Sequence, residues 1–218
     1  MGEAEARRRL RQRRDADHAR DVLMDAAASV FAQKGYYGTT MEDVAAASGY
    51  SPAAIYKYFK NKDDLFRRVW STMANRLQGI FEESTTIPVP FELRLRWLVT
   101  RASQLLETSP NLLVAFIAHR PYATRTHSAF ERQALQHYRT HQEQMVRLMD
   151  QGIAEGVLRE GGASDYALLL TGLLYEFAHK WVTAEGKFDP NQATDRLIEL
   201  FLTGAGNPVS PTEARKRP

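Results

Sequence analysis

The chain has 218 residues, a formal net charge of +3, 44% hydrophobic residues and no cysteine. The lack of cysteine excludes disulfides, thiolate nucleophiles and zinc–thiolate sites, and it fits a cytoplasmic protein. No apolar stretch is long enough to cross a bilayer and the start of the chain lacks a secretory apolar core, so we expect no membrane partner.

The positive charge is concentrated at the two ends of the chain. Residues 1–20 carry seven arginines against four acidic residues, and the tail from Asn207 adds a local charge of +2. The body between them therefore sums to −2. We expect residues 1–17 to form a basic flexible arm, of the kind that phosphate attracts, and residues 207–218 to form a flexible tail.

Helix signals follow one another from the first apolar segment onward. An apolar rhythm of helical period starts at Leu23 and ends at Gly35, a residue well suited to terminate a helix. Thr40 and Asp43 have the spacing of a capping box, and Gly49 would end the helix that they open. The first two helices of the chain are therefore short and closely connected.

A third short helix begins directly after Gly49-Tyr50. Ser51-Pro52 combines a good N-cap with proline at the first helical position, and the helix is expected to reach about Phe59. Asn61 then caps a fourth helix with one long apolar stripe, which residues 85–90 interrupt.

The rest of the chain is also expected to be helical. The further helices are expected over about 91–107, from Pro110, over about 128–155, over about 164–184 and over about 190–204. The total is about nine helices with no strand, so the sequence predicts an all-α fold.

The second and third helices carry the clearest functional pattern. A two-residue connection containing glycine is typical of a helix-turn-helix, which we place at Thr40–Phe59. In the third helix only Ile55 and Phe59 are clear core residues. The small and polar residues on its other face suit a close approach to the major groove of DNA.

Two stretches of this region closely resemble the tetracycline-repressor (TetR) family: FAQKGYYGTTMEDVA from Phe31 and SGYSPAAIYKYFKNKDDLF from Ser48. The likeness covers about residues 20–70, roughly a quarter of the chain. It implies a helix-turn-helix DNA-binding domain over 18–78 and a helical ligand-binding and dimerisation domain over 79–206. A member of this family would be a ligand-responsive regulator, most often a repressor, that binds a near-palindromic operator as a homodimer.

The resemblance also implies contacts with operator DNA. The implied contact residues are Thr39, Thr40, Ser51, Pro52, Ala53, Ala54, Tyr56, Lys57, Tyr58 and Lys62. The two threonines would meet the DNA backbone, and residues 51–54 would face the base edges. Tyr56 and Lys57 would lie along the groove wall, Tyr58 would sit at a phosphate-contacting position, and Lys62 would neutralise a phosphate. Packing within the domain is the alternative for Tyr56 and Tyr58. Because residues 21–68 hold six acidic and six basic residues, the arm Arg7–Arg14 is expected to add affinity, with entry into the minor groove as a hypothesis.

The C-terminal half suggests a dimer and a sensor. The helices over 164–184 and 190–204 are apolar nearly all round, so each is expected to bury two sides, one of them in a homodimer. Aromatic and amphipathic residues on the middle helices are candidates for a pocket that takes an apolar or aromatic effector. These candidates are Trp97, Phe116, His119, Tyr122, Tyr138, His141 and Phe177.

Signals for catalysis or for a metal are weak. His137 and His141 share a helix face, and Glu176 precedes His179 by three residues, but neither pair has the further ligands that a metal site needs. We expect no cofactor and no enzymatic activity. The alternative left open is a helical small-molecule-binding protein or a metal-carboxylate enzyme without DNA binding.

Overall fold

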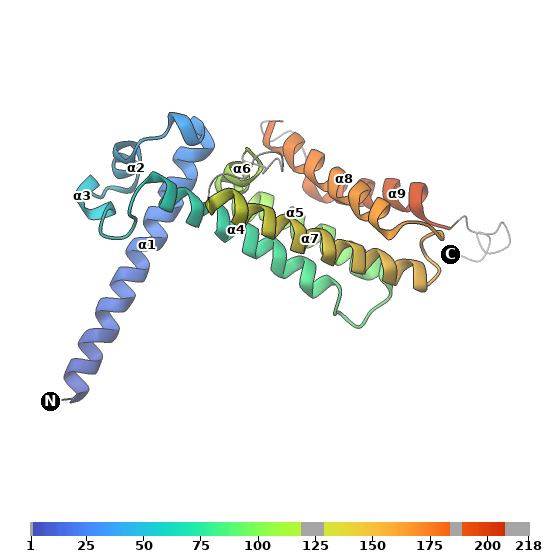
Figure 1. Ribbon diagram of the computed structural model, residues 1–218, viewed down its shortest axis with the longest axis horizontal. Helices are drawn as coiled ribbons and strands as arrows, with labels where there is room; N and C mark the ends of the chain where they lie inside the picture. Colours follow the sequence, from blue (N-terminus) through green and yellow to red (C-terminus); the bar gives the residue numbers. More distant parts are fainter. Residues whose placement is uncertain (1, 119–128, 184–188, 208–218) are drawn as a thin grey trace. The chain divides into compact units, whose positions relative to one another are not determined.

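A computed structural model describes residues 2–118, 129–183 and 189–207 (Figure 1). These residues form nine helices and no strand, apart from one isolated antiparallel bridge between Leu158 and Gly206. The helices are α1 (Gly2–Gly38), α2 (Met41–Ser48), α3 (Pro52–Ile55), α4 (Lys62–Ser84), α5 (Phe91–Thr108), α6 (Pro110–Ala118), α7 (Ala129–Ala154), α8 (Ala163–Thr183) and α9 (Pro190–Ala205). The expected all-α fold is confirmed. No helix in these three ranges is both long and apolar enough to cross a membrane.

The chain divides into two compact units. Residues up to 74 form one unit together with α6, and the second unit comprises residues 75–110 and the chain beyond α6. Helix α4 runs from the first unit into the second, because the division falls between Ala74 and Asn75. A single continuous helix therefore connects the two units covalently.

Helix α1 differs from the sequence-based expectation. Its residues 2–17 are helical and continuous with the rest of α1, instead of forming a flexible arm. From Glu3 to Lys34 the sequence contains no glycine or proline and is rich in alanine and arginine, which favour a helix. The helical geometry breaks only at Gly35, where φ is 68° and ψ is 174°.

The first unit has a core shared by α1 to α4. Its largest fully buried side chains are Leu23, Phe31, Ile55, Phe59, Leu65, Trp70 and Met73. The rings of Phe31 and Phe66 meet edge to face with centroids 4.9 Å apart, which fixes α1 against α4. The helix-turn-helix is therefore held on a packed support.

The second unit packs α5 and α7 to α9 around a separate core. Fully buried members of this core are Phe91, Leu95, Leu98, Val99, Leu148, Met149, Ala167, Leu170 and Phe201. Arg94 is only 7% exposed and pairs with Glu155, while its guanidinium also donates to Gln151 at 2.9 Å. The carboxylate of Glu155 also accepts the backbone N–H of Phe91 at 2.7 Å, so this cluster joins the start of α5 to the end of α7.

Candidate nucleic-acid interface

Helix α2 begins and ends as its sequence predicts. The hydroxyl of Thr40 accepts the backbone N–H of Asp43 at 3.1 Å, and the carboxylate of Asp43 accepts the N–H of Thr40 at 3.0 Å. Gly49 ends the helix with φ at 72°, in the left-handed region that favours glycine. The expected capping box and turn are both confirmed.

Helix α3 is shorter than expected but correctly opened. Ser51 is its N-cap and accepts the N–H of Ala54 at 3.2 Å, and Pro52 occupies the first turn. The α-helix ends at Ile55, whereas the sequence suggested about Phe59. Beyond Ile55 the backbone tightens, because the N–H of Tyr58 bonds to the carbonyl of Ile55 at 2.9 Å across three residues.

Two side chains anchor this segment and leave its other face exposed. Ile55 and Phe59 are 0% and 1% exposed, which confirms them as core residues. The residues with exposed side chains are Ser51, Pro52, Ala53, Tyr56 and Lys57, and Ala54 is half-buried. This surface combines small side chains near the start of α3 with a phenol and an ammonium group after it, which suits contact with base edges and phosphates.

Two residues expected to touch DNA make hydrogen bonds within the protein. The side chain of Thr39 is buried, and its hydroxyl donates to the carbonyl of Gly35 at 2.7 Å. The ammonium of Lys62 donates to the carbonyls of Tyr36 and Thr39, both at 3.0 Å. These groups satisfy carbonyls near the break in α1 at Gly35, and DNA contact by Thr39 and Lys62 stays a prediction. The exposed hydroxyl of Thr40 still has a proton to donate to a phosphate.

Tyr36 contacts two residues at the start of α4, and no pattern in the sequence predicts this. Its ring lies 4.6 Å from the ammonium of Lys62, and its hydroxyl donates to the carboxylate of Asp63. Burial and the carboxylate of Asp63 raise the pKa of Tyr36 to about 12, so the phenol stays protonated and keeps donating. These contacts join the end of α1 to the start of α4. Residues so distant in sequence have no local signal that pairs them.

The start of α4 is held by a second polar cluster. Asn61 caps the helix by accepting the N–H of Asp64 at 2.8 Å, as the sequence predicts. Asp64 is buried; burial would raise its pKa, but the N–H of Lys60 and the guanidinium of Arg67 hold the pKa below its ordinary value. The carboxylate therefore remains charged and stabilises the turn between α3 and α4.

Tyr58 is expected either to pack within the domain or to contact a phosphate. It is half-buried, and the guanidinium of Arg20 on α1 lies over its ring, 5.8 Å from the centroid. This contact places Tyr58 at the junction between α1 and the segment that follows α3. Phosphate contact by its hydroxyl stays a prediction.

The pocket candidates that the structure describes are divided between the two units. Trp97 and Phe177 are partly buried against the core of the second unit, and His141 lies with its ring centroid 4.0 Å from that of Phe81. Tyr138, on α7, is also half-buried. Phe116 belongs to the first unit, where it stacks on Trp70 with ring centroids 5.0 Å apart. His119 and Tyr122 lie outside the described residues.

The two histidines considered for a metal have other surroundings. Nδ1 of His137 lies 3.2 Å from the side-chain oxygen of Gln78, and burial lowers the pKa of His137. Burial thus favours a neutral imidazole. Within residues 2–118, 129–183 and 189–207, no group of three or more metal-ligating side chains comes together.

Comparison with known proteins agrees with this geometry. Residues 23–69, which include α2 and α3, match the family model for bacterial regulatory proteins of the tetR family. The fatty acid metabolism regulator protein of Bacillus subtilis is 24% identical over 191 residues, covering 85% of this chain and 94% of that protein.

Solved structures share the fold over most of the chain. The MbdR regulator from Azoarcus sp. CIB superposes with a TM-score of 0.76 at 22% identity, covering 85% of this chain and 98% of that one. AibR, solved with isovaleryl coenzyme A and operator DNA, has a TM-score of 0.71 at 17% identity, covering 84% and 97%. Residues 23–69 therefore match the helix-turn-helix region of the bacterial regulatory proteins of the tetR family, and the chain as a whole shares the fold of these solved regulators.

Proposed function

We propose that this protein is a transcriptional repressor that binds a near-palindromic operator as a homodimer and leaves it when a small molecule binds. The observation that carries this proposal is the exposed face of the α3 segment. Two fully buried anchors, Ile55 and Phe59, hold a surface of small, hydroxyl-bearing and cationic side chains outward. Such a surface has an evident use in reading a major groove and none in an enzyme core.

The homodimer is supported by unpartnered leucines on the last two helices. Leu168 and Leu169 on α8 are 61% and 45% exposed, and Leu200 on α9 is 51% exposed. The opposite sides of both helices are buried in the core of their own unit. A second copy of the chain would cover these leucines and present two α3 segments to successive major grooves.

The effector proposed for the first tests is an acyl-coenzyme A thioester. The relative from Bacillus subtilis is named as a regulator of fatty acid metabolism, and AibR was solved with isovaleryl coenzyme A. The half-buried Trp97, Tyr138 and Phe177 supply apolar surface that suits an acyl chain. Binding would raise the melting temperature, and free coenzyme A is the control that lacks the acyl chain.

Binding to DNA is tested with fragments that flank the protein's own gene. The unmodified protein should shift one fragment in preference to random DNA at moderate salt. Ala53→Asp and Lys57→Gln should weaken this binding, because they place a charge against the groove or remove one from it. Lys180→Gln on α8 makes the same charge change far along the chain and should leave it intact. If no fragment competes better than random DNA, the proposal fails.

Release by the effector is a separate measurement. An acyl-coenzyme A series of increasing chain length should dissociate the specific complex, and free coenzyme A should not. Dissociation requires that the effector bind the DNA-free state more tightly, since a ligand shifts an equilibrium only by its differential affinity. An operator complex unaffected by every thioester in the series would exclude this class of effector while leaving DNA binding intact.

A further inference from the structure

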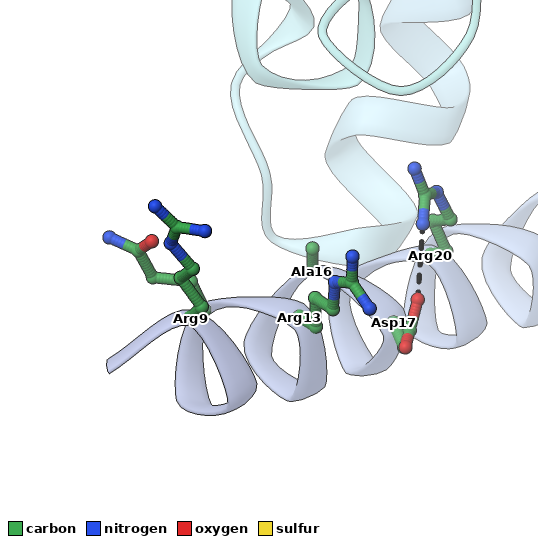
Figure 2. Close-up of a pocket in the computed structure, with 6 residues that line it drawn as sticks. Arg9, Arg13, Ala16, Asp17 and Arg20 are labelled. Atoms are coloured by element: carbon green, nitrogen blue, oxygen red, sulfur yellow. Dashed lines mark hydrogen bonds and ion pairs between the residues drawn. The ribbon is translucent and has the colours of Figure 1, made fainter. Parts of the chain in front are cut away.

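The N-terminal part of α1 carries a row of arginines on one side. Arg9, Arg13 and Arg20 are separated by four and seven residues, which places them on the same face of a helix, with Ala16 between them. Figure 2 shows these three arginines pointing to the same side of α1, around a shallow depression lined by α1 alone. We call Arg9, Arg13 and Arg20 the arginine face.

The arginine face continues the side of α1 that packs against the helix-turn-helix. Leu23 and Ala27 are 0% exposed and follow the same helical phase as Arg9 and Arg20. Figure 1 shows the N-terminal part of α1 continuing past α2 and α3, within the same unit. Where α1 leaves the core, its inward side therefore changes from apolar to cationic.

The arginine face also begins next to the candidate reading segment. The guanidinium of Arg20 lies over the ring of Tyr58, one residue beyond the exposed Lys57. With a rise of about 1.5 Å per residue, Arg9 lies roughly 16 Å further along α1 than Arg20. This length equals the axial rise of about five base pairs of B-DNA. The face can therefore follow DNA beyond the segment that α3 contacts.

The guanidinium groups remain available to a ligand. Arg9 pairs with Glu5 at 2.8 Å and Arg20 pairs with Asp17 at 3.1 Å, but the side chains in both pairs are more than half exposed to solvent. Exposed pairs of this kind contribute little and are readily exchanged for a phosphate. Residues 21–68 have no net charge, so the first 20 residues, at +3, supply the positive potential of this unit.

We infer that the arginine face binds the phosphate backbone of duplex DNA flanking the sequence that α3 reads. The inference rests on the proposed function and extends the contact surface beyond the helix-turn-helix. It replaces the expected entry of an arm into the minor groove. An α-helix with side chains is about 10–12 Å wide, whereas the minor groove of B-DNA is about 6 Å wide. A helical segment can therefore follow the backbone but cannot enter that groove.

The competing partner for a basic helix is an anionic membrane surface. Interfacial helices carry a broad apolar face, yet between Glu5 and His18 the only large apolar side chain is Leu10. The segment therefore suits DNA better than a membrane, because DNA offers negative charge and requires no apolar face. In the proposed complex, DNA is also the polyanion that lies next to α3.

The test compares two charge-matched double variants of the full chain. Arg9→Gln/Arg13→Gln removes two members of the arginine face, and Arg7→Gln/Arg11→Gln removes two exposed arginines from the opposite side of the same helix. Glutamine is close to arginine in helix propensity, so equal helix content is expected and is checked by circular dichroism. Operator affinity is then measured against salt concentration on a long fragment and on one trimmed to the α3 contacts.

The first variant should reduce the slope of log K against log salt by about 1.8 per protomer on the long fragment, since each phosphate contact contributes about 0.9. The opposite-side variant should leave the slope close to that of the unmodified protein, and trimming should abolish the difference. Equal losses from both variants, or no loss from either, would overturn the inference. So would a loss of binding to phosphatidylserine vesicles with unchanged DNA binding. If the unmodified protein binds no DNA selectively, the proposed function itself fails.

Discussion

Ile55 provides a direct test of how the reading segment is held. The side chain is 0% exposed, and replacing it with alanine removes three carbon atoms from the core of the first unit. At about 0.8 kcal/mol for each buried carbon the transfer loss is about 2.4 kcal/mol, and the cavity left behind brings the range to about 2–5 kcal/mol. Ile55→Val removes one carbon and should cost about 1 kcal/mol.

Thermal unfolding followed by circular dichroism should show this order. Ile55→Ala should lower the melting temperature by at least about 5 °C, because a protein of this size loses roughly 2–4 °C for each kcal/mol. Amide hydrogen exchange gives the local readout, since the N–H groups of Tyr58 and Phe59 donate to the carbonyl of Ile55 at 2.9 and 3.0 Å.

Tyr56→Ala is the matched control on the neighbouring exposed position. Tyr56 is 51% exposed, so its loss should change the free energy of unfolding by less than about 0.5 kcal/mol while weakening operator binding. If Ile55→Ala left the melting temperature unchanged and the two amides equally protected, the idea that Ile55 anchors the segment would be refuted.

Three further outcomes are expected. Lys62→Met should lower the free energy of unfolding, measured by chemical denaturation, by about 1–3 kcal/mol, because two charge-assisted hydrogen bonds are lost. A change in the salt dependence of DNA affinity would instead reveal a contact between Lys62 and a phosphate. Gly152→Ala should lower the free energy of unfolding by about 1–3 kcal/mol, because its Cβ would lie 2.7 Å from the buried ring of Phe91. Gly79→Ala is the control: its Cβ would meet no atom within 4 Å, so the variant should stabilise α4 by about 0.5–1 kcal/mol. Equal effects of the two variants in thermal unfolding would contradict this. The hydrogen bonds from Lys34 and from the N–H of Thr40 lower the pKa of Asp43 from 3.8 to about 2. The contribution of this carboxylate to stability is therefore present above about pH 4 and is lost as the pH falls towards 2. The difference in unfolding free energy between the unmodified protein and Asp43→Asn should shrink across that window, and a constant difference would exclude the contribution.

Local signals in the sequence predicted the helix-turn-helix well. The pairs Thr40–Asp43 and Ser51–Pro52 act within one turn of helix, so the residue types alone determine which backbone groups they can satisfy. The all-α fold, the cap at Asn61 and the burial of Ile55 follow from equally short-range patterns. The structure confirms each of them.

Roles that depend on distant partners could not be predicted in the same way. Lys62 bonds to carbonyls more than twenty residues earlier, and Phe116 stacks on Trp70 across a gap of more than forty residues. Nothing within a few residues of either position specifies those contacts. The helix over residues 2–17 was missed for another reason: a dense row of arginines suggested an open arm, although arginine is also a good helix former.

The unbroken course of α1 from Gly2 to Gly35 has a mechanical consequence. At about 1.5 Å per residue, Arg9 lies roughly 40 Å along the axis from the break at Gly35. A tilt of the helix by about 5° about that break would carry Arg9 sideways by roughly 3 Å, which exceeds the tolerance of a hydrogen bond to a phosphate. The helix thus acts as a lever: a small rotation at the break is amplified at the arginine face into the loss of a contact.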